Sequence, residues 1–362
     1  MKIGILTFHR EINSGANLQA FALTNYLNNC GYHAELIDFV PNSGIDRRSL
    51  KRKILHLLKL FIVRSARAER AKIVKFRRFQ EDYYKKSKTI FYGDRELLNA
   101  KLNYDVLISG SDQILNLTLS DLSFSYYLPF DDAIKISYAS SFGRDNISDI
   151  EKWAIMKYLP SFKSLSFREK SGYSITSSLI NVKENNIVVD PDFLLTKDEW
   201  IALVKEKKMR KKYILVYAME QSEWIEKTVD QVSSQFANYE VKIIYGTNCK
   251  LNTNIHLKSI KNVGPIEFLR FFYEAGIVIT NSFHGLAFSM IFGKKTYCCS
   301  HSTKNARIYN LLQMAGEERK IIDSKNHKID YVDGDFAYKA INHLILMSKK
   351  YINDSLSGGK ND

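Results

Sequence analysis

A histidine with hydrogen-bonding neighbours follows an apolar segment in the second half of the chain. Residues 277–280 are β-branched and predict a buried strand, and residues 286–292 are mostly apolar helix formers. The turn between them contains Asn281, Ser282, His284 and Gly285. An imidazole exchanges a proton near neutral pH, and free N–H groups at a helix start attract anions. The turn therefore favours acid–base chemistry on an anion, and a simple helix cap explains it equally well.

A second polar cluster follows the strand expected at residues 104–109. It consists of Gly110, Ser111, Asp112, Gln113 and Asn116. The glycine allows a tight turn, and the side chains offer the hydrogen-bond partners that hydroxyl-rich ligands need. Asp112 is a candidate base, or alternatively a turn residue that caps a helix expected to begin near Ile114.

Further polar residues follow the strands expected at 134–139 and 164–167. Ser141 comes after the first strand, and Arg168 with Glu169 comes after the second. An arginine at a strand end can bind two oxygens of a phosphate or carboxylate. The alternative is a salt bridge from Arg168 to Glu169 or to a neighbouring acid.

The start of the chain predicts a βαβ unit. A strand at residues 2–8 leads through a polar loop into a helix at 18–29 and a strand at 34–38. The loop contains Asn13, Gly15 and Asn17, which could hold a sugar or phosphate or form a capped turn. It lacks the spaced glycines of a dinucleotide fingerprint and the Gly-Lys-Ser/Thr of a phosphate-binding loop, so neither NAD nor ATP is indicated.

The strand–helix alternation repeats after a charged linker helix expected at residues 197–212. With 362 residues the chain has the length of two domains, and its 45% hydrophobic content suffices for two cores. We expect an α/β protein with two Rossmann-like doubly wound domains. The predicted boundaries are 1–196, with a basic helical insertion at about 46–90, then 197–330, and then 331–362 with a closing helix and a flexible tail.

Most of the net charge of +14 lies in one block. Residues 47–88 contain 16 Lys and Arg against three acidic residues, and an apolar stretch at 54–63 lies inside the block. Such a block is typical of a nucleic-acid footprint or of a helix on an anionic membrane. A solvated basic helix whose apolar side packs on its own domain is the third interpretation, which we place slightly ahead.

The cysteines and the hydropathy indicate a compartment. Cys30, Cys249, Cys298 and Cys299 form neither a CxxC pair nor a metal-ligand pattern. Neither a disulfide framework nor a signal peptide is indicated, so we expect a cytoplasmic protein. No apolar run approaches the roughly 20 residues that span a bilayer.

Taken together and in order, the polar strand ends resemble the polysaccharide pyruvyl transferase family. The matching segments begin at Asn13, Gly110, Tyr138, Ser166, Asp190 and Thr280, and they run from about residue 2 to residue 315. The resemblance implies two domains that face across a cleft, as in GT-B glycosyltransferases, with the acceptor side in the first domain and the donor side in the second. It also implies phosphoenolpyruvate as donor, a sugar hydroxyl pair as acceptor, and a role in bacterial capsule or exopolysaccharide assembly.

The resemblance assigns roles to the polar residues. His284 would be the general acid/base, Arg168 would grip the donor, and Asp112 with Gln113 and Asn17 would contact the acceptor. Ser282 stands where some relatives carry arginine, so Arg307 or Lys304 would supply that cation. No metal or cofactor is required by this scheme.

The expected partners are phosphoenolpyruvate and a sugar, with a lipid-diphosphate-linked oligosaccharide as one form of the acceptor. Residues 47–88 could attach the protein to the inner face of the plasma membrane, and nucleic acid is not expected. A GT-B-type glycosyltransferase that uses a nucleotide sugar is the alternative, but the acidic residue for a ribose and the aromatic for a base are not evident in the second domain.

Overall fold

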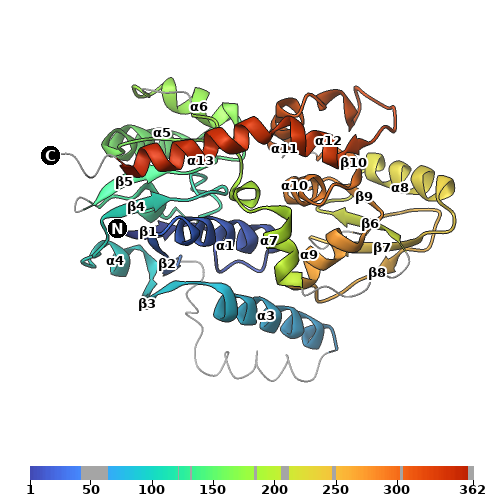
Figure 1. Cartoon of the computed structure of the whole chain (residues 1–362), viewed down its shortest axis with the longest axis horizontal. Coiled ribbons are helices and arrows are strands. Elements are labelled where there is room, and N and C mark those ends of the chain that lie inside the picture. Colours follow the sequence, from blue (N-terminus) through green and yellow to red (C-terminus); the bar gives the residue numbers. More distant parts are fainter. Residues whose placement is uncertain are drawn as a thin grey trace. The chain divides into compact units, whose positions relative to one another are not determined.

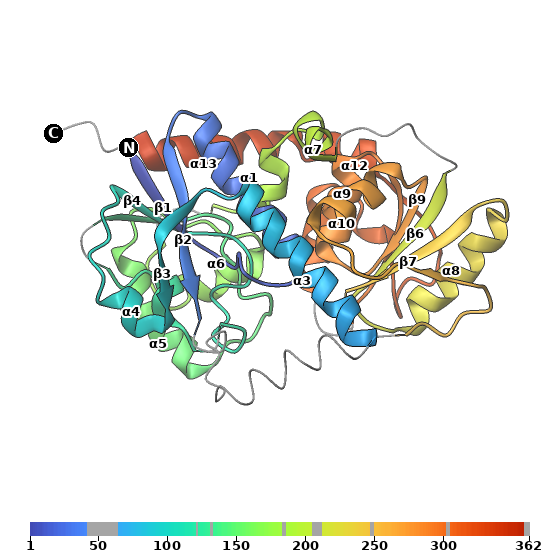
Figure 2. The same cartoon turned by 90° about the horizontal axis from the view of Figure 1, so that it is seen from below.

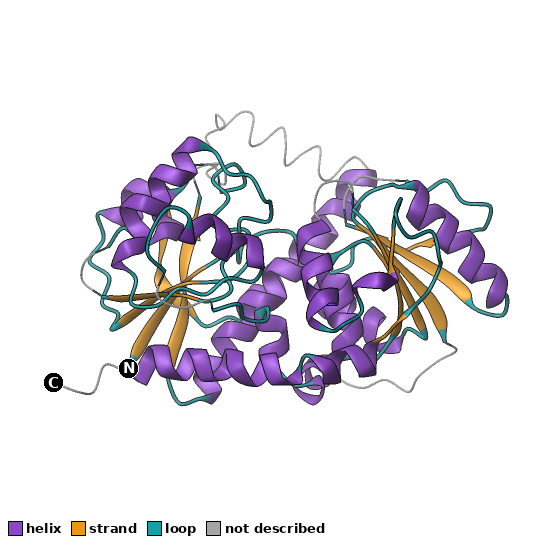
Figure 3. Cartoon of the chain, turned by 90° about the horizontal axis from the view of Figure 1, so that it is seen from above, coloured by secondary structure: helices purple, strands orange, loops and turns teal. Residues whose placement is uncertain are grey.

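The computed structural model describes residues 1–41, 64–120, 122–130, 133–182, 186–204, 212–246, 250–301 and 305–357. The chain forms two compact units, of which the first comprises Met1–Leu194 with Leu344–Asp362 and the second comprises Leu195–His343. Each unit contains one largely parallel sheet with helices on both faces (Figure 3). The two doubly wound α/β domains expected from the sequence are therefore confirmed.

Five parallel strands in the order β3-β2-β1-β4-β5 form the sheet of the first unit. The strands are β1 (Lys2–Leu6), β2 (His33–Val40), β3 (Lys86–Tyr92), β4 (Val106–Ser109) and β5 (Ile134–Ser137). The helices are α1 (Ser14–Asn29), α3 (Arg64–Tyr83), α4 (Gly93–Leu98), α5 (Asp149–Tyr158), α6 (Lys170–Ser177) and α13 (Asn342–Ser357). Short 3₁₀ helices are η2 (Phe124–Tyr127), η3 (Leu159–Ser161) and η4 (Pro191–Leu194).

Both faces of this first sheet are covered (Figures 1 and 2). On one face, Leu23 of α1 and Ile352 of α13 join a core with Ile5 of β1. On the other face, Ile155 of α5 joins a core with Leu107 of β4. Burial on both faces explains why these strands read as continuous apolar runs.

The second unit has a sheet in the order β11-β10-β9-β6-β7-β8, and β12 pairs antiparallel with β10. The strands are β6 (Tyr213–Ala218), β7 (Glu240–Tyr245), β8 (Lys258–Ser259), β9 (Ile277–Thr280), β10 (Lys295–Cys299), β11 (Ile321–Ile322) and β12 (Val332–Asp333). The helices are α7 (Lys197–Val204), α8 (Glu223–Gln235), α9 (Pro265–Glu274), α10 (Phe283–Ile291), α11 (Asn305–Met314) and α12 (Gly334–Ala340), with a 3₁₀ turn η5 (Glu318–Lys320).

In the first unit, the expected strand at 164–167 and the segment 186–189 form only isolated bridges. Residues 164–167 pair with the sheet at Ser164 and Phe167, and residues 186–189 pair only at Ile187. Serine side chains replace part of the ladder, because the Ser137 hydroxyl accepts from the Ser166 amide at 2.8 Å. These segments still extend the sheet beyond β5, in the order in which they follow along the chain. They do not form regular strands.

The prediction of a helix that begins near Ile114 is wrong. The residues after Gln113 form turns, and the Asn116 side chain accepts from the amides of Thr118 at 3.1 Å and Leu119 at 3.4 Å. An asparagine that bonds its own backbone in this way competes with a helix.

The basic block is only partly described. Its apolar stretch at 54–63, on which the membrane interpretation rested, lies outside the described residues. The described helix α3 buries Phe76 and Phe79, and Phe79 contacts Phe21 of α1 at 6.0 Å between ring centroids. This agrees with a basic helix whose apolar side packs on its own domain. Helix does not continue to residue 90, because β3 is an edge strand made largely of Lys, Thr and aromatic residues.

The closing helix expected within residues 331–362 is two helices, α12 and α13, separated at Ile341. The sequence placed a boundary after residue 196, and the structure divides the units after Leu194 and returns α13 to the first unit.

In the described part of the chain, no helix combines the length and the hydropathy that crossing a bilayer requires.

Candidate functional site

The strand order in the first unit reverses between β1 and β4. Ligands of open α/β sheets collect at such a point, beyond the carboxyl ends of the strands. The loops that leave these two strands are residues 7–13 and 110–116. They contain most of the polar residues that the sequence singled out in this domain.

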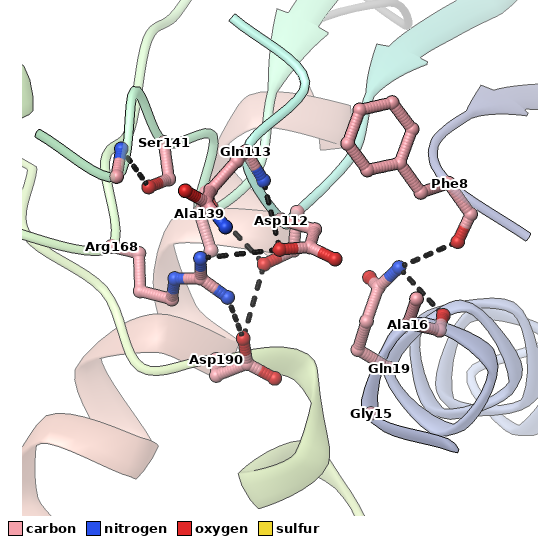
Figure 4. Close-up of polar contacts among 12 residues, drawn as sticks. Phe8, Gly15, Ala16, Gln19, Asp112, Gln113, Ala139, Ser141, Arg168 and Asp190 are labelled. Atoms are coloured by element: carbon pink, nitrogen blue, oxygen red, sulfur yellow. Dashed lines mark hydrogen bonds and ion pairs between the residues drawn. The ribbon is translucent and has the colours of Figure 1, made fainter. Parts of the chain in front are cut away.

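Arg168 is the centre of a buried ion-pair cluster in the first unit. Its guanidinium donates to Asp190 at 2.7 Å, and it lies 3.5 Å from Asp112 and 3.8 Å from Glu169. Figure 4 shows it between the carboxylates of Asp112 and Asp190. Burial lowers the pKa of Arg168, but the three carboxylates raise it above its ordinary value. The guanidinium thus stays charged and is already neutralised by protein.

This arrangement corresponds to the salt-bridge alternative for Arg168. An anionic donor would approach a guanidinium that lies among three carboxylates. Such surroundings repel a phosphate or carboxylate. The geometry therefore favours a positioning role for Arg168, in which it holds Asp112 and Asp190 in place.

Ser141 and Glu169 hold the loop that follows β5. The Ser141 hydroxyl donates to Glu169 Oε1 at 2.5 Å and accepts from the Gly143 amide at 2.9 Å. Gly143 has φ +67°, and a Cβ there would lie 1.9 Å from the Gln113 side chain. Only glycine therefore allows Gln113 to lie over this loop.

Asp112 has an unusual backbone. Its φ is +72°, and Ala139 at the end of the neighbouring strand has φ +52°. Aspartate tolerates this region better than alanine does, and such strain is concentrated at functional sites. The Asp112 carboxylate accepts from the Gln113 amide at 2.9 Å, which orients it in the loop.

The remaining residues of this cluster are largely structural. Gly110 passes so close to Thr7 that a Cβ would lie 2.9 Å from it. Ser111 is buried and donates to the Ala139 carbonyl at 3.1 Å. Asn116 donates to the Phe142 carbonyl at 3.0 Å and is turned away from solvent. These contacts shape the loop that presents Asp112.

At the start of α1, Asn13 is the helix cap, and its side chain accepts from the amides of Gly15 and Ala16. Asn17 is fully buried. Its amide donates to the carbonyls of Glu11 and Asn13, and its oxygen accepts from Gln80 and Tyr84 at 2.9 Å each. Because all four hydrogen-bonding positions are used, Asn17 joins α1 to α3 and has no position left for an acceptor sugar.

The second unit also reverses its strand order, between β6 and β9. Asn281 links the loops that leave these strands, because its side chain accepts from the Met219 amide at 2.7 Å and donates to the Glu220 carbonyl at 3.0 Å. The side chain is buried. Asn281 is therefore part of the frame of the site.

His284 lies in the first turn of α10, immediately beyond this loop. Ser282 is the helix cap, and its hydroxyl accepts from the Gly285 amide at 3.4 Å. A Cβ at Gly285 would lie 2.4 Å from the Thr280 hydroxyl, so the helix can begin this close to β9 only with glycine. The turn therefore contains both features expected from the sequence, the helix cap Ser282 and the histidine His284.

Arg307 lies near the same turn. Its guanidinium is 5.8 Å from the Phe283 ring, and the Phe283 ring is 5.1 Å from His284. His301 follows β10 and lies 3.3 Å from Glu220 through its Nδ1. Lys304 lies outside the described residues. Helix α10, the segment after β10 and helix α11 thus supply two histidines and one arginine, and the loop after β6 supplies Glu220 beside His301. The three basic side chains suit a small anion.

Some of these residues were missed by the sequence analysis. His301 stands shortly before Lys304 and Arg307 in the sequence but was given no role. Gln19 was also given no role. Its signal in the sequence was an amide side chain on the apolar face of a helix. His9 and Asp38 form a buried pair at 3.1 Å, and Arg10 adds a bond of 2.6 Å to the same carboxylate oxygen.

The signal for this pair was an aspartate within an apolar strand. Burial raises the pKa of Asp38, but the bonds from His9 and Arg10 outweigh burial and hold it well below its usual range. Asp38 therefore remains a carboxylate that orders the loop after β1.

Several solved structures show a distant likeness. A UDP-GlcNAc 2-epimerase from Neisseria meningitidis, bound to UDP-GlcNAc, has 9% identity and a TM-score of 0.46, with 98% of this chain and 94% of that chain covered. A putative UDP-N-acetylglucosamine 2-epimerase from Listeria monocytogenes has 9% identity and a TM-score of 0.47, with 98% and 97% covered. The spinosyn rhamnosyltransferase SpnG, complexed with spinosyn aglycone, has 10% identity and a TM-score of 0.38, with 99% and 96% covered.

Among curated protein sequences there is no match. The polysaccharide pyruvyl transferase family model, in contrast, matches residues 13–303, which include every motif described above. The match extends over well more than half of the chain and over both units. The chain belongs to the polysaccharide pyruvyl transferase family.

Proposed function

We propose that this protein transfers the pyruvyl group of phosphoenolpyruvate to two hydroxyls of a sugar and forms a pyruvate ketal. Family membership supports a transferase of this class. The observation that carries the proposal is the place of His284, in the first turn of α10 and beyond the carboxyl end of β9. A proton donor and a helix N-terminus there match an enol phosphate.

The reaction balances without an oxidant, a metal or a cofactor. The methylene carbon of phosphoenolpyruvate gains a proton and becomes the methyl group. One sugar hydroxyl adds to the neighbouring carbon, the C–O bond to phosphate breaks, and the second hydroxyl closes the ring. Of the two hydroxyl protons, one ends on the methyl group and the other on phosphate.

In the second unit, His284 would give the proton to the methylene carbon. The phosphate and carboxylate need cations, and Arg307 with its planar fork is the candidate for bidentate binding. His301, which lies beside Glu220, would contribute when protonated. The N-terminus of α10 adds a partial positive charge.

In the first unit, Asp112 would accept the proton of the attacking hydroxyl, with Gln113 beside it. Arg168 would act by positioning Asp112, which replaces the donor contact inferred from the family motif. Asn17 is not retained as an acceptor contact, because its bonds are used by protein. The surplus of carboxylates in this unit suits a neutral sugar better than an anion.

We propose further that the acceptor is a precursor of a cell-surface polysaccharide at the inner face of the membrane. A lipid-diphosphate-linked oligosaccharide is the form that the basic block at residues 47–88 would favour, since anionic lipid attracts Lys and Arg. Sedimentation of the protein with anionic but not with neutral vesicles tests this attachment.

The activity is tested in two steps. Thermal unfolding is measured with phosphoenolpyruvate and with a panel of nucleoside diphosphates, because a bound ligand raises Tm. Phosphate release from phosphoenolpyruvate is then measured with and without a mixture of bacterial glycan acceptors. We expect stabilisation by phosphoenolpyruvate and acceptor-dependent release. Stabilisation by a nucleoside diphosphate alone would instead identify a nucleotide-sugar enzyme.

A further inference from the structure

Gln19 carries an oxygen that the protein leaves unused. The side chain lies on α1 and is 0% exposed. Its amide nitrogen contacts three oxygens, those of Thr7 Oγ1 at 3.0 Å, the Phe8 carbonyl at 3.3 Å and the Ala16 carbonyl at 3.0 Å. Its Oε1 is buried and has no hydrogen-bond donor among the residues that the structure describes.

The orientation of this amide is fixed by its neighbours. Two of the three oxygens are carbonyls, which only accept. The third, Thr7 Oγ1, donates its own proton to the Ser111 carbonyl at 2.8 Å and so accepts from Gln19. Turning the amide over would place Oε1 against these acceptors. Oε1 must therefore point away from them.

Oε1 points toward the proposed acceptor site. The bonds from Gln19 to Thr7 and from Thr7 to Ser111 place the amide beside the loop that presents Asp112. Figure 4 shows the Gln19 amide and the Asp112 carboxylate directed toward one another, one from α1 and the other from the loop after β4. Two hydrogen-bond acceptors, Gln19 Oε1 and the Asp112 carboxylate, thus meet at the switch point of the first unit.

An unsatisfied buried carbonyl is destabilising, so a donor is expected when the site is filled. We propose that Gln19 Oε1 accepts a hydrogen bond from the second hydroxyl of the acceptor sugar, next to the hydroxyl that Asp112 deprotonates. This inference rests on the proposed ketal-forming function and identifies Gln19 as the residue that selects a diol.

The two acceptors differ in a way that suits the two hydroxyls. Asp112 is a carboxylate and can take a proton, so the hydroxyl on it becomes the first nucleophile. An amide oxygen is a far weaker base and can only hold its hydroxyl in place. That hydroxyl closes the ring afterwards, when its proton leaves with phosphate. A donor anion is disfavoured here because Asp112 and Asp190 are both negative.

The test measures sugar binding without phosphoenolpyruvate, so its result does not depend on whether pyruvyl transfer is observed. Methyl gluco-, galacto- and mannopyranosides, and their deoxy forms at each hydroxyl, are titrated by NMR into wild type and Gln19→Met. For the best sugar, wild type should bind two of the deoxy forms about fivefold to tenfold more weakly. Gln19→Met should bind the parent sugar more weakly and lose the penalty for one of those two hydroxyls only.

Gln221→Met is the matched control, because Gln221 is exposed in the second unit. It should keep both penalties. The proposal is overturned if Gln19→Met also keeps both, or if wild type binds none of these sugars.

Gln19 anchors the loop after β1, so a second measurement covers a variant that does not fold. A wild-type crystal soaked with the best methyl hexopyranoside should place a ring hydroxyl within about 3 Å of Gln19 Oε1. A sugar bound elsewhere, with only water at Oε1, contradicts the proposal.

Discussion

Arg168 donates to Asp190 at 2.7 Å, and both side chains are almost completely buried. The pair joins the segment after Phe167 to the segment that enters η4, and Asp112 completes it from the loop after β4. Arg168, whose type and place suggested anion binding, therefore helps to hold Asp112, the proposed base.

Asp190→Asn should lower the free energy of unfolding by about 3 kcal/mol, because it removes the charged partner in the shortest ion pair of a buried guanidinium. Urea unfolding followed by circular dichroism measures the change. Glu223→Gln is the control, since it breaks the exposed pair with Lys227 and should cost less than about 1 kcal/mol. Equal effects for both variants would contradict the structural role of the Arg168 cluster.

His284→Gln should reduce phosphate release from phosphoenolpyruvate by about 10²- to 10⁴-fold, since a positioned proton donor contributes this much. Stabilisation by phosphoenolpyruvate in thermal unfolding should remain, because the anion contacts are unchanged. His343→Gln, at an exposed histidine, should match wild type in both assays. A rate within a few-fold of wild type would remove His284 from the chemistry.

Arg307→Gln should raise the KM for phosphoenolpyruvate by about tenfold to a hundredfold, which corresponds to the loss of a charged hydrogen bond of about 1.5–3 kcal/mol. Arg307→Lys should restore part of the loss, because lysine keeps the charge and lacks the fork. Initial rates over a range of phosphoenolpyruvate concentrations give the KM. Arg319→Gln, at an exposed arginine, is the control. An unchanged KM in Arg307→Gln would mean that the donor binds elsewhere.

Lys294 should make stability rise with pH. Burial, together with the charges of Lys197 and Lys212, lowers the pKa of Lys294 to about 8. The folded state therefore loses this proton at a lower pH than the unfolded state does, whose pKa is about 10.4. Between these values the unfolded state binds more protons, so the free energy of unfolding increases with pH.

Wild type should consequently gain stability relative to Lys294→Met when urea unfolding is repeated at pH 7 and pH 9.5. The exposed Lys227→Met variant should show no such trend against wild type. A constant difference between wild type and Lys294→Met at the two pH values would show that Lys294 is not perturbed.

Much of the fold follows from local patterns. The apolar runs at β1, β4, β6 and β9 and the polar turns after them were sufficient to predict two doubly wound sheets and the place of His284. The strand 164–167 and the helix near Ile114 did not form, because serine and asparagine side chains took the backbone partners that regular structure would use. Such competition depends on neighbours that a local pattern does not contain.

The site was predictable only in part, for a related reason. The residues near Arg168 in the sequence include a single acid, Glu169. The shortest ion pair of Arg168 is nevertheless with Asp190, and Asp112 reaches Arg168 from much earlier in the chain. Asn17 likewise has no free oxygen because Gln80 of α3 donates to it. Among the described residues, the oxygen of Gln19 is left unbonded because its amide nitrogen faces Thr7. Residue type indicated that these positions are polar, and tertiary contacts decided which bonds they make.

The return of α13 to the first unit means that the second unit is inserted into the first. Tyr351 donates to the Ser137 carbonyl at 2.8 Å, and Ser348 accepts from the Val189 amide at 3.0 Å. A fragment ending at Leu194 would lose these bonds, expose the apolar core that Ile352 of α13 covers, and aggregate. Excision of 195–343 with a short bridge would preserve both the bonds and the core. Dissecting the enzyme into halves thus requires two cuts, and the last helix belongs with the first strand.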